Sequence, residues 1–544
     1  MMALQTVRCL YVGCAALGIG FFIFALMFPP FLISDRKALL PPCHKMYNCR
    51  TSSTMPPPFV ASPSSDAEEV KTIKELIAWP GPSGNVSFMS STSPQNCDYH
   101  ILNPKDNYSV GEIVEVLLTA RDHRKQPKSY GGDFFRAKLH SRQLEAGVTG
   151  SVKDHCNGTY TFTFQMLWAG DVDIYIQLIH SSEAVDILRK LRDTRPDQFD
   201  FRGYFQKNGT TDTMQCNVEI QNKPVCEYRD PGTGERWFCV RPKRLPCSAL
   251  VFHSAGTIIN VTNQEEDAFF HSSVTKQIIK PGRIQNLHVL PGNRSLDLKR
   301  LPSCTPGLPI PQPSGFYHGG VWTSLVCNSR RFPTASHASA CLKGKIVYMF
   351  GDSTLRQWWI YLVKFIPTLK SIDLHVQPQA GPLLATDPEN GLLMQWRVHG
   401  KPLRMAKTMV ADTHYMANDI AAIGGGPDVV IAFNIWAHFT SFPVEVYIQR
   451  LRGIRRAITE LLERSPETTV IIKTANTGHL YGSNWLSHQL DRILRSMFFG
   501  MHVAFVDAWE STSCHYLPES LHPQRPITRN QVDMFLSFIC PSKV

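Results

Sequence analysis

Apolar residues in the last third of the chain form short continuous runs separated by stretches with helical spacing. We expect strands at 345–350 (KIVYMF), 428–433 (DVVIAF), 468–473 (TTVIIK) and 503–507. Helical periodicity falls between and after them, at 355–366, 444–463, 485–498 and 529–539. Uninterrupted apolar strands are typical of a parallel sheet that is covered on both faces. Residues 341–544 are therefore predicted to form a doubly wound α/β domain.

The first half of the chain has a different period, in which apolar and polar residues alternate. Alternation runs through 111–120, 159–166 and 171–178, and the sequence WAGD at 168–171 suggests a hairpin turn between the last two. Short strands with glycine-rich turns are typical of a β-sandwich. We predict an immunoglobulin-like sandwich at 95–200, followed at 201–300 by a cysteine-rich part.

Two segments have a composition that does not favour a packed core. Residues 35–94 are rich in Pro, Ser and Thr and predict a flexible stem, interrupted by a short amphipathic piece at 70–79. Residues 301–340 begin with LPSCTPGLPIPQP and predict a proline-rich linker between the two halves.

Near the N-terminus, residues 10–32 are apolar and uncharged, and Arg8 precedes them. This length suffices to span a bilayer and exceeds the usual core of a signal peptide. Because no good cleavage site follows, we favour an uncleaved signal anchor at 1–34 over a cleaved signal peptide. The first predicts a type II Golgi membrane protein and the second a secreted one, with membrane contact only through this segment.

Sequons and cysteines place the body of the chain in the secretory pathway. Thirteen of the 15 cysteines lie beyond the apolar segment, a density that suits an oxidising lumen. Cys216, Cys226, Cys239 and Cys247 are widely spaced, which favours disulfides over zinc, and all three pairings stay open. An odd count leaves one thiol free or intermolecular, and we expect no metal site. The N-glycosylation sequons, all beyond that segment, are at Asn85, Asn107, Asn157, Asn208, Asn260 and Asn293.

The net charge of +11 is spread along the chain without a long basic block. A solvated surface explains it, and a patch for acidic glycans is the alternative. No nucleic-acid-binding motif is present, so nucleic acid is not an expected partner.

The candidate chemistry lies where the predicted strands of the α/β domain end. Ser353, in Gly351-Asp352-Ser353-Thr354, sits between a strand and a helix whose first N–H groups could stabilise an oxyanion. The serine is therefore a candidate nucleophile, and a plain helix N-cap is the alternative. His522, in ESLHP at 519–523, is the candidate base.

Other polar residues could complete this site. Glu519 would orient His522, with Asp507 as the alternative acid. Asn434 follows the second strand and would donate to the oxyanion or simply form a turn. Arg356 could bind a substrate carboxylate or pack structurally, whereas Trp436 and His438 could line a sugar pocket or belong to the core.

These blocks, taken in order, resemble those of SGNH (GDSL-like) hydrolases, and the string GDSTLRQWW resembles the PC-esterase branch. The upstream strings YGGDFFRAKL and GTYTFTFQMLWAGDVDIYIQLIHSSEAV, with the cysteine cluster, resemble a neurexophilin domain. From about residue 90 onward, the chain resembles the neurexophilin and PC-esterase domain family. The resemblance implies an acyl esterase or O-acetyltransferase acting on glycans, with sialic acids among the acceptors.

The chain departs from the family pattern at the acid, where it has Glu519, and at Thr354 and Ala437. The SGNH hydrolase pattern also has a glycine in its second sequence block, and Gly381, Gly391, Gly400 and the run at 424–426 all stay open as candidates for it. The blocks favour an enzyme with no bound cofactor that acts on a glycan or glycoprotein. Acetyl-CoA is a candidate acyl donor. Because its charged phosphates cannot cross a bilayer unaided, another protein must deliver it, or the acyl group must be passed on from an existing ester. The alternative is a non-catalytic secreted ligand or adhesion protein that binds a cell-surface receptor.

Overall fold

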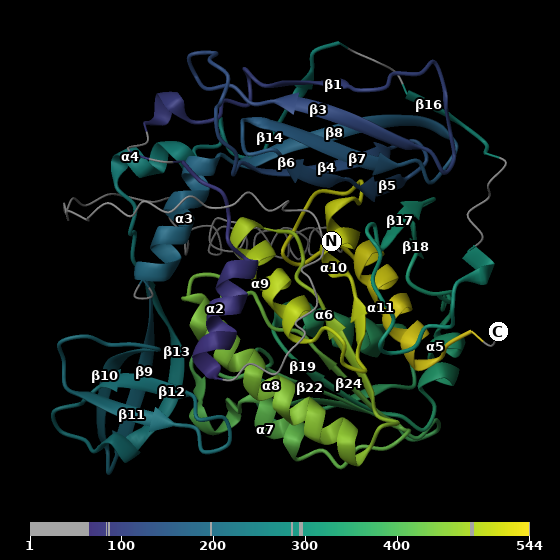
Figure 1. Cartoon of the computed structure of the whole chain (residues 1–544). Coiled ribbons are helices and arrows are strands. Elements are labelled where there is room, and N and C mark those ends of the chain that lie inside the picture. The colour runs from purple at the N-terminus through teal and green to yellow at the C-terminus, as the bar shows by residue number, and fades with distance from the viewer. Residues whose placement is uncertain are drawn as a thin grey trace, which may run out of the picture.

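The computed structural model describes residues 65–82, 84, 87–195, 198–283, 287–292, 298–478 and 484–542. It has three β-rich or α/β parts (Figure 1). A β-sandwich lies above an α/β part, and a smaller sheet lies beside the α/β part.

Two sheets share one core of buried side chains and form the sandwich. The first sheet has the order β15 (Lys280–Pro281), β1 (Asp98–Ile101), β3 (Ile113–Thr119), β7 (Thr159–Gln165) and β6 (Ser151–Asp154). The second has the order β18 (Val321–Ser324), β17 (Gly315–His318), β5 (Ala146–Thr149), β4 (Phe134–Ser141), β8 (Gly170–His180), β16 (Leu287–Leu290) and β2 (Tyr108–Ser109), and β14 (Gln277–Ile278) also pairs with β8. Helix α3 (Ser182–Thr194) follows β8.

The predicted hairpin at 168–171 is wrong. Strand β7 pairs with β3 and β6, whereas β8 pairs with β4, β14 and β16 in the opposite sheet. Each strand buries alternate residues in the same core, for example Phe162 and Ile176. The segment that joins β7 to β8 crosses from one sheet to the other. The apolar faces of these two strands therefore pack against each other across the core of the sandwich.

A separate sheet holds most of the cysteine cluster. Its order is β11 (Val225–Arg229), β12 (Arg236–Val240), β10 (Thr210–Asn217), β9 (Phe199–Lys207), β13 (Leu250–Ile258) and β23 (Thr408–Met409). Disulfides join Cys216 to Cys239 and Cys226 to Cys247, which decides among the three open pairings. The short helix α4 (Gln264–Asp267) follows β13.

The third part is built on a mostly parallel sheet. Its order is β20 (Lys370–Ile372), β21 (Leu383–Asp387), β22 (Leu392–Arg397), β19 (Ile346–Phe350), β24 (Val429–Phe433), β25 (Thr469–Lys473) and β26 (Ala504–Val506). The five strands from β22 to β26 are parallel, and β20 and β21 are antiparallel. All four strands predicted from apolar runs are present, each within a residue or two of its expected ends.

Helices cover both faces of this sheet, as uninterrupted apolar strands require. Residues of β19 pack into two different hydrophobic cores, one on each face of the sheet. Val347 and Met349 lie in the first core, and Phe350 lies in the second. The first core includes side chains of α5 (Ala335–Leu342), α6 (Ser353–Phe365) and α11 (Arg525–Ile539). The second includes α7 (Met416–Ala421), α8 (Val444–Arg464) and α9 (Asn484–Met497), and the short α10 (Ala508–Ser513) follows β26.

The described parts of the predicted stem and linker are folded rather than free. Helix α2 (Asp66–Leu76) packs on α8, where the buried Glu69 pairs with Arg452 and Arg455 (Figure 1). In the proline-rich segment, the disulfide Cys304–Cys327 is buried in the α/β core, and β17 extends the sandwich sheet. Proline content limits local conformation but does not prevent tertiary burial, and here the segment joins two parts of the fold.

The predicted anchor at 1–34 and the first half of the stem lie outside the described residues. Within the described part of the chain, no helix is long and apolar enough to cross a membrane. Cys341 and Cys540 form a further disulfide, and Cys156 is also disulfide-bonded. These bonds are consistent with a secreted or lumenal protein. Two free thiols, Cys97 and Cys514, are buried among the described residues, where we expected one.

Four predicted sequons lie on the sheet-rich half. Asn107, Asn157 and Asn208 are exposed and Asn260 is half-buried, whereas Asn85 and Asn293 lie outside the described residues.

Candidate active site

Ser353 is the first residue of α6 and follows β19 by a tight turn. Asp352 caps the helix, and its carboxylate accepts hydrogen bonds from the Thr354 N–H at 2.8 Å and the Thr354 hydroxyl at 2.7 Å. The turn needs Gly351, since a Cβ there would lie 1.9 Å from Asn434 Oδ1. Asp352 thus does the capping, and the Ser353 hydroxyl is left free of that task.

The hydroxyl of Ser353 is hydrogen-bonded to His522, with 2.7 Å between Oγ and Nε2. Two side chains hold the backbone on either side of this histidine. Asn476 donates to the Leu521 carbonyl at 2.9 Å, and Gln357 donates to the Pro523 carbonyl at 3.3 Å. The structure therefore brings together the predicted nucleophile and base, which are 169 residues apart in the sequence.

Burial lowers the pKa of His522 below its ordinary value, although the nearby Asp352 carboxylate opposes the shift. The positive charges of Arg356 and Lys473 lower it further. The imidazole is therefore neutral near pH 7, as a general base must be.

Asn434 serves the turn rather than an oxyanion. Its Oδ1 accepts from the Asp352 N–H at 3.0 Å, and its Nδ2 donates to Asp352 Oδ1 at 2.9 Å and to Thr354 Oγ1 at 2.8 Å. Both N–H groups of the amide are used, and the side chain is fully buried. The sequence left two roles open for Asn434, an oxyanion donor and a turn residue at the end of a strand. Its hydrogen bonds in the structure are those of the turn residue, and they position the Ser353 turn.

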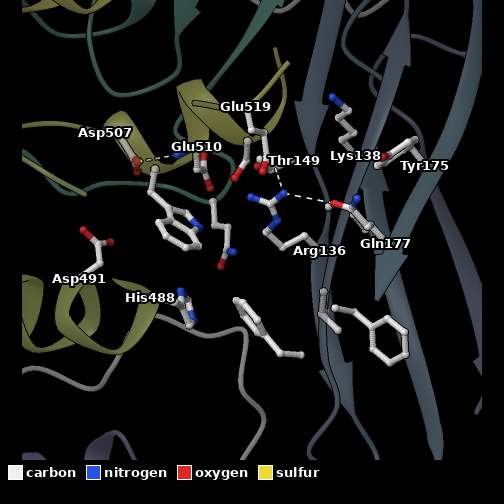
Figure 2. A pocket seen from close by; sticks show the side chains of 18 of the residues that line it. Arg136, Lys138, Thr149, Tyr175, Gln177, His488, Asp491, Asp507, Glu510 and Glu519 are labelled. Atoms are coloured by element: carbon white, nitrogen blue, oxygen red, sulfur yellow. Dashed lines mark hydrogen bonds and ion pairs between the residues drawn. The ribbon is translucent and has the colours of Figure 1, made fainter. Parts of the chain in front are cut away.

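Neither predicted acid is hydrogen-bonded to His522 among the described residues. Glu519 pairs instead with Arg136 of β4, on the sandwich (Figure 2). Asp507 pairs with Arg495 at 3.0 Å and caps α10. The negative charge felt most by His522 is that of Asp352. Burial alone would raise the pKa of Asp352. The charge that His438 carries once it is protonated, the hydrogen bond from Asn434 and the charge of Lys473 lower it.

The predicted substrate residues have structural partners. Arg356 donates to the Pro378 carbonyl at 2.8 Å and lies over the Trp396 ring. Trp436 is 1% exposed and belongs to the core, so its predicted place in a sugar pocket is wrong. His438 is half-buried and hydrogen-bonds His399 through ring nitrogens 3.0 Å apart. Burial lowers its pKa to about 4, so it is neutral at pH 7.

Sequence reasoning missed Lys473, which ends β25 and is 1% exposed. Its Nζ donates to Asn476 Oδ1 at 2.7 Å, and Asn476 holds the loop of His522. Burial lowers the pKa of Lys473 to about 7. A lysine at the end of an otherwise apolar strand was the available signal, because buried lysines require partners.

Two of the open glycines lie at the same edge of the sheet as Ser353. Gly400 follows the carboxyl end of β22, and Gly381 precedes the antiparallel β21 at the same end. Gly391, in contrast, faces Gly344 at the opposite end, where the 424–426 run also precedes β24. Within the described residues, no group of His, Cys, Asp or Glu side chains could hold a metal ion.

Each half of the chain matches a protein-family model. Residues 70–274 match the neurexophilin model, and residues 322–540 match the model described as NXPE family member 4-like, C-terminal domain. The two matched ranges span most of the chain. The protein is a member of the neurexophilin and PC-esterase domain (NXPE) family, as the sequence motifs predicted. The NXPE C-terminal domain suggests an esterase- or acyltransferase-like family.

Proposed function

We propose that this protein is a serine-dependent O-acyltransferase or acyl esterase that acts on glycans in the secretory pathway. The observation that carries the proposal is the 2.7 Å contact between Ser353 Oγ and His522 Nε2 at the carboxyl edge of the sheet. Active sites of open α/β sheets lie at this edge. The order of the Ser353 turn, Asn434 and His522 supports an SGNH-type fold, joined to an immunoglobulin-like sandwich.

In the proposed reaction, Ser353 Oγ attacks an acyl carbonyl while His522 Nε2 takes its proton. The acyl–serine bond forms as the bond to the leaving group breaks, and His522 returns the proton to that group. An acceptor hydroxyl, from a glycan or from water, then attacks the ester, and Ser353 regains its hydrogen. The Ser353 N–H, to which no acceptor is bonded among the described residues, can stabilise the oxyanion.

Transfer requires an activated donor, for which acetyl-CoA is our proposal, delivered to the lumen by another protein. The acceptor would be a sialylated or other glycan of a glycoprotein. Residence in the Golgi as a type II membrane protein, or secretion, would bring the site to such glycans. If water is the acceptor, the same acyl–serine intermediate makes the protein an esterase.

The test supplies acetyl-CoA and a sialylated glycan to the purified protein and follows ester formation and loss by mass spectrometry. Acetylation that disappears in Ser353→Ala supports transfer. Loss of O-acetyl groups already present, again dependent on Ser353, supports hydrolysis. Neither gain nor loss with any acceptor, in protein whose fold is intact, would contradict an acyl enzyme.

A second function has one observation in its favour. Glu519, the residue predicted to orient His522, is held by Arg136 on the sandwich instead. A non-catalytic ligand or adhesion protein could retain this interdomain pair as a structural contact. A cell-surface receptor that binds the Ser353→Ala variant as well as wild type, with an unchanged cellular response, would support that role.

A further inference from the structure

A large cavity lies between the sandwich and the α/β domain, away from Ser353. Its volume is about 660 Å³, within the usual range for ligand pockets. Strands β4 and β8 form one wall, and α9, α10 and the loop that leads to His522 form the other (Figure 2). Residues of both domains therefore shape the site, including Arg136, Lys138, Tyr175, His488, Trp509 and Glu519.

Arg136 stands in this cavity with most of its hydrogen-bonding capacity unused. Its Nη2 contacts the Glu519 carboxylate and the Gln177 side chain, the latter at 3.3 Å. Its Nε and Nη1 are buried and have no partner among the described residues. The Thr149 hydroxyl and His488 Nδ1, which also line the cavity, are likewise buried and unpartnered there. Buried polar groups are normally satisfied, so such a cluster points to a bound molecule.

The charge around Arg136 is unbalanced in favour of cations. Four of the five lining carboxylates are occupied elsewhere. Asp133 accepts hydrogen bonds from Thr92 and from the Ser182 N–H, both at 2.8 Å, and burial raises its pKa to about 7. Asp491 and Asp507 both pair with Arg495, at 2.7 and 3.0 Å. Glu510 accepts two hydrogen bonds from Ser314, at 2.6 and 2.8 Å, and burial raises its pKa to about 7.

Lys138, Lys276 and Arg492 also line the cavity. Burial lowers the pKa of each, to about 8 for Lys276 and to about 10 for Arg492. A buried cation whose charged form is destabilised gains from a nearby anion. The carboxylate of Glu519 is the one anion that contacts Arg136 among the described residues.

We propose that this cavity binds a carboxylate-bearing ligand of sugar size, which takes the place of Glu519 on Arg136. Glu519 itself shows that the guanidinium fits a carboxylate, and Nη2 together with the unused Nε or Nη1 allows a two-point contact. Tyr175 and Trp509, both half-buried, also line the cavity, and aromatic side chains are suited to contact with the apolar side of a sugar ring.

Displacement of Glu519 has a consequence for His522, and this step rests on the proposed function. Glu519 is three residues before His522, in the same loop. Once released from Arg136, its carboxylate becomes available to orient the imidazole, the role that the sequence predicted for it. Ligand in the interdomain cavity would thus activate Ser353.

Ligand-detected NMR titration of the purified protein with D-glucuronate tests the binding step, with D-glucose as the uncharged control. We expect saturable binding of glucuronate alone. Arg136→Gln should weaken it at least tenfold, because a charge-assisted hydrogen bond is lost. Lys190→Gln, which removes an exposed positive charge outside the cavity, should bind as wild type does. Glu519→Gln should bind more tightly than wild type, since the internal competitor loses its charge.

Ser353→Ala should bind as wild type does, so a failed binding step and a failed catalytic proposal are distinguishable. No binding of glucuronate, or equal binding of glucose, would overturn the site. Unchanged or weaker binding in Glu519→Gln would also overturn it, even if Arg136→Gln fails to fold.

The activation step is tested by the rate at which a fluorophosphonate labels Ser353. Glucuronate should accelerate labelling of wild type but not of Glu519→Gln, and equal acceleration of both would refute this step.

Discussion

Replacement of Asn434 by alanine separates the role that the structure gives this residue from the role that the sequence suggested. Its amide makes three hydrogen bonds, one to the Asp352 N–H, one to the Asp352 carboxylate and one to the Thr354 hydroxyl. All lie in a fully buried environment, so water cannot easily replace the lost partner. If Asn434 holds the turn, its loss should destabilise the fold as well as the site.

The magnitude follows from these bonds. A neutral hydrogen bond contributes about 0.5–1.5 kcal/mol and one to a charged group about 1.5–3 kcal/mol. Allowing for relaxation of the site, Asn434→Ala should lower the free energy of unfolding by about 2–4 kcal/mol. For a domain of roughly 150–250 residues, this corresponds to a fall in melting temperature of about 5–15 °C.

The assay combines a thermal melt with fluorophosphonate labelling at a temperature where the variant is folded. Ser353→Ala is the matched control, because it removes the nucleophile and leaves the three bonds of Asn434 in place. We expect this control to lose labelling and keep its melting temperature, whereas Asn434→Ala loses both. An Asn434→Ala protein with a melting temperature within 1–2 °C of wild type (about 0.5 kcal/mol) but no labelling would refute the reasoning and favour an oxyanion donor.

Three further predictions concern the turn, the base and the buried histidines. Gly351→Ala places a Cβ 1.9 Å from Asn434 Oδ1 and should lower the melting temperature at least as much as Asn434→Ala does. Gly424→Ala is the control, because a Cβ there meets open space, and it should leave the melting temperature unchanged. Equal melting temperatures of the two glycine variants would count against the tight turn. Because burial lowers the pKa of His522, the rate of Ser353 labelling should rise with pH to a plateau with its midpoint below 6.5, and a midpoint above 6.5 would contradict a desolvated base. Stability should fall as the pH drops from about 6.5 towards 4, because several buried histidines bind protons in the unfolded state at a pH where the folded state does not. Carboxyl groups whose pKa is raised by burial oppose this trend: Asp133 and Glu510, to about 7, and also Asp154, Asp491 and Asp533. The histidines with a lowered pKa outnumber them, so the urea midpoint should be lower at pH 5 than at pH 7.5, and an equal or higher midpoint would be inconsistent. These histidines are His123, His140, His253, His399, His438, His488, His515 and His522.

The α/β half could be predicted because its strands are unbroken apolar runs, a local signal that depends little on the rest of the chain. Strand β24, for example, spans Val429–Phe433 where 428–433 was expected. Pairing is not a local property. The alternation of β7 and β8 showed which face of each strand is buried but not which strand lies beside it, and the predicted hairpin was wrong for that reason.

The site divides in the same way. Ser353 lies on a turn with a recognisable sequence, and the block around His522 suggested a base, so both could be proposed in advance. The partner of Glu519 could not, because Arg136 is 383 residues away on the sandwich. The position of Lys473 at the end of an apolar strand was a signal in the sequence, but only the fold shows that it contacts Asn476. Contacts between domains are set by tertiary packing, which no local pattern encodes.

The most direct test of the central claim, that Ser353 and His522 form a nucleophile and base, is covalent labelling by a fluorophosphonate followed by intact-mass measurement and peptide mapping. We predict one added phosphonyl group on Ser353 of wild type, none in Ser353→Ala, and a rate at least about 100-fold lower in His522→Ala, the usual contribution of a positioned base. Among the described residues the His522 imidazole makes one hydrogen bond, to Ser353 Oγ, so this variant should remain folded. Absence of labelling in folded wild type, or labelling that persists in Ser353→Ala, would contradict the account.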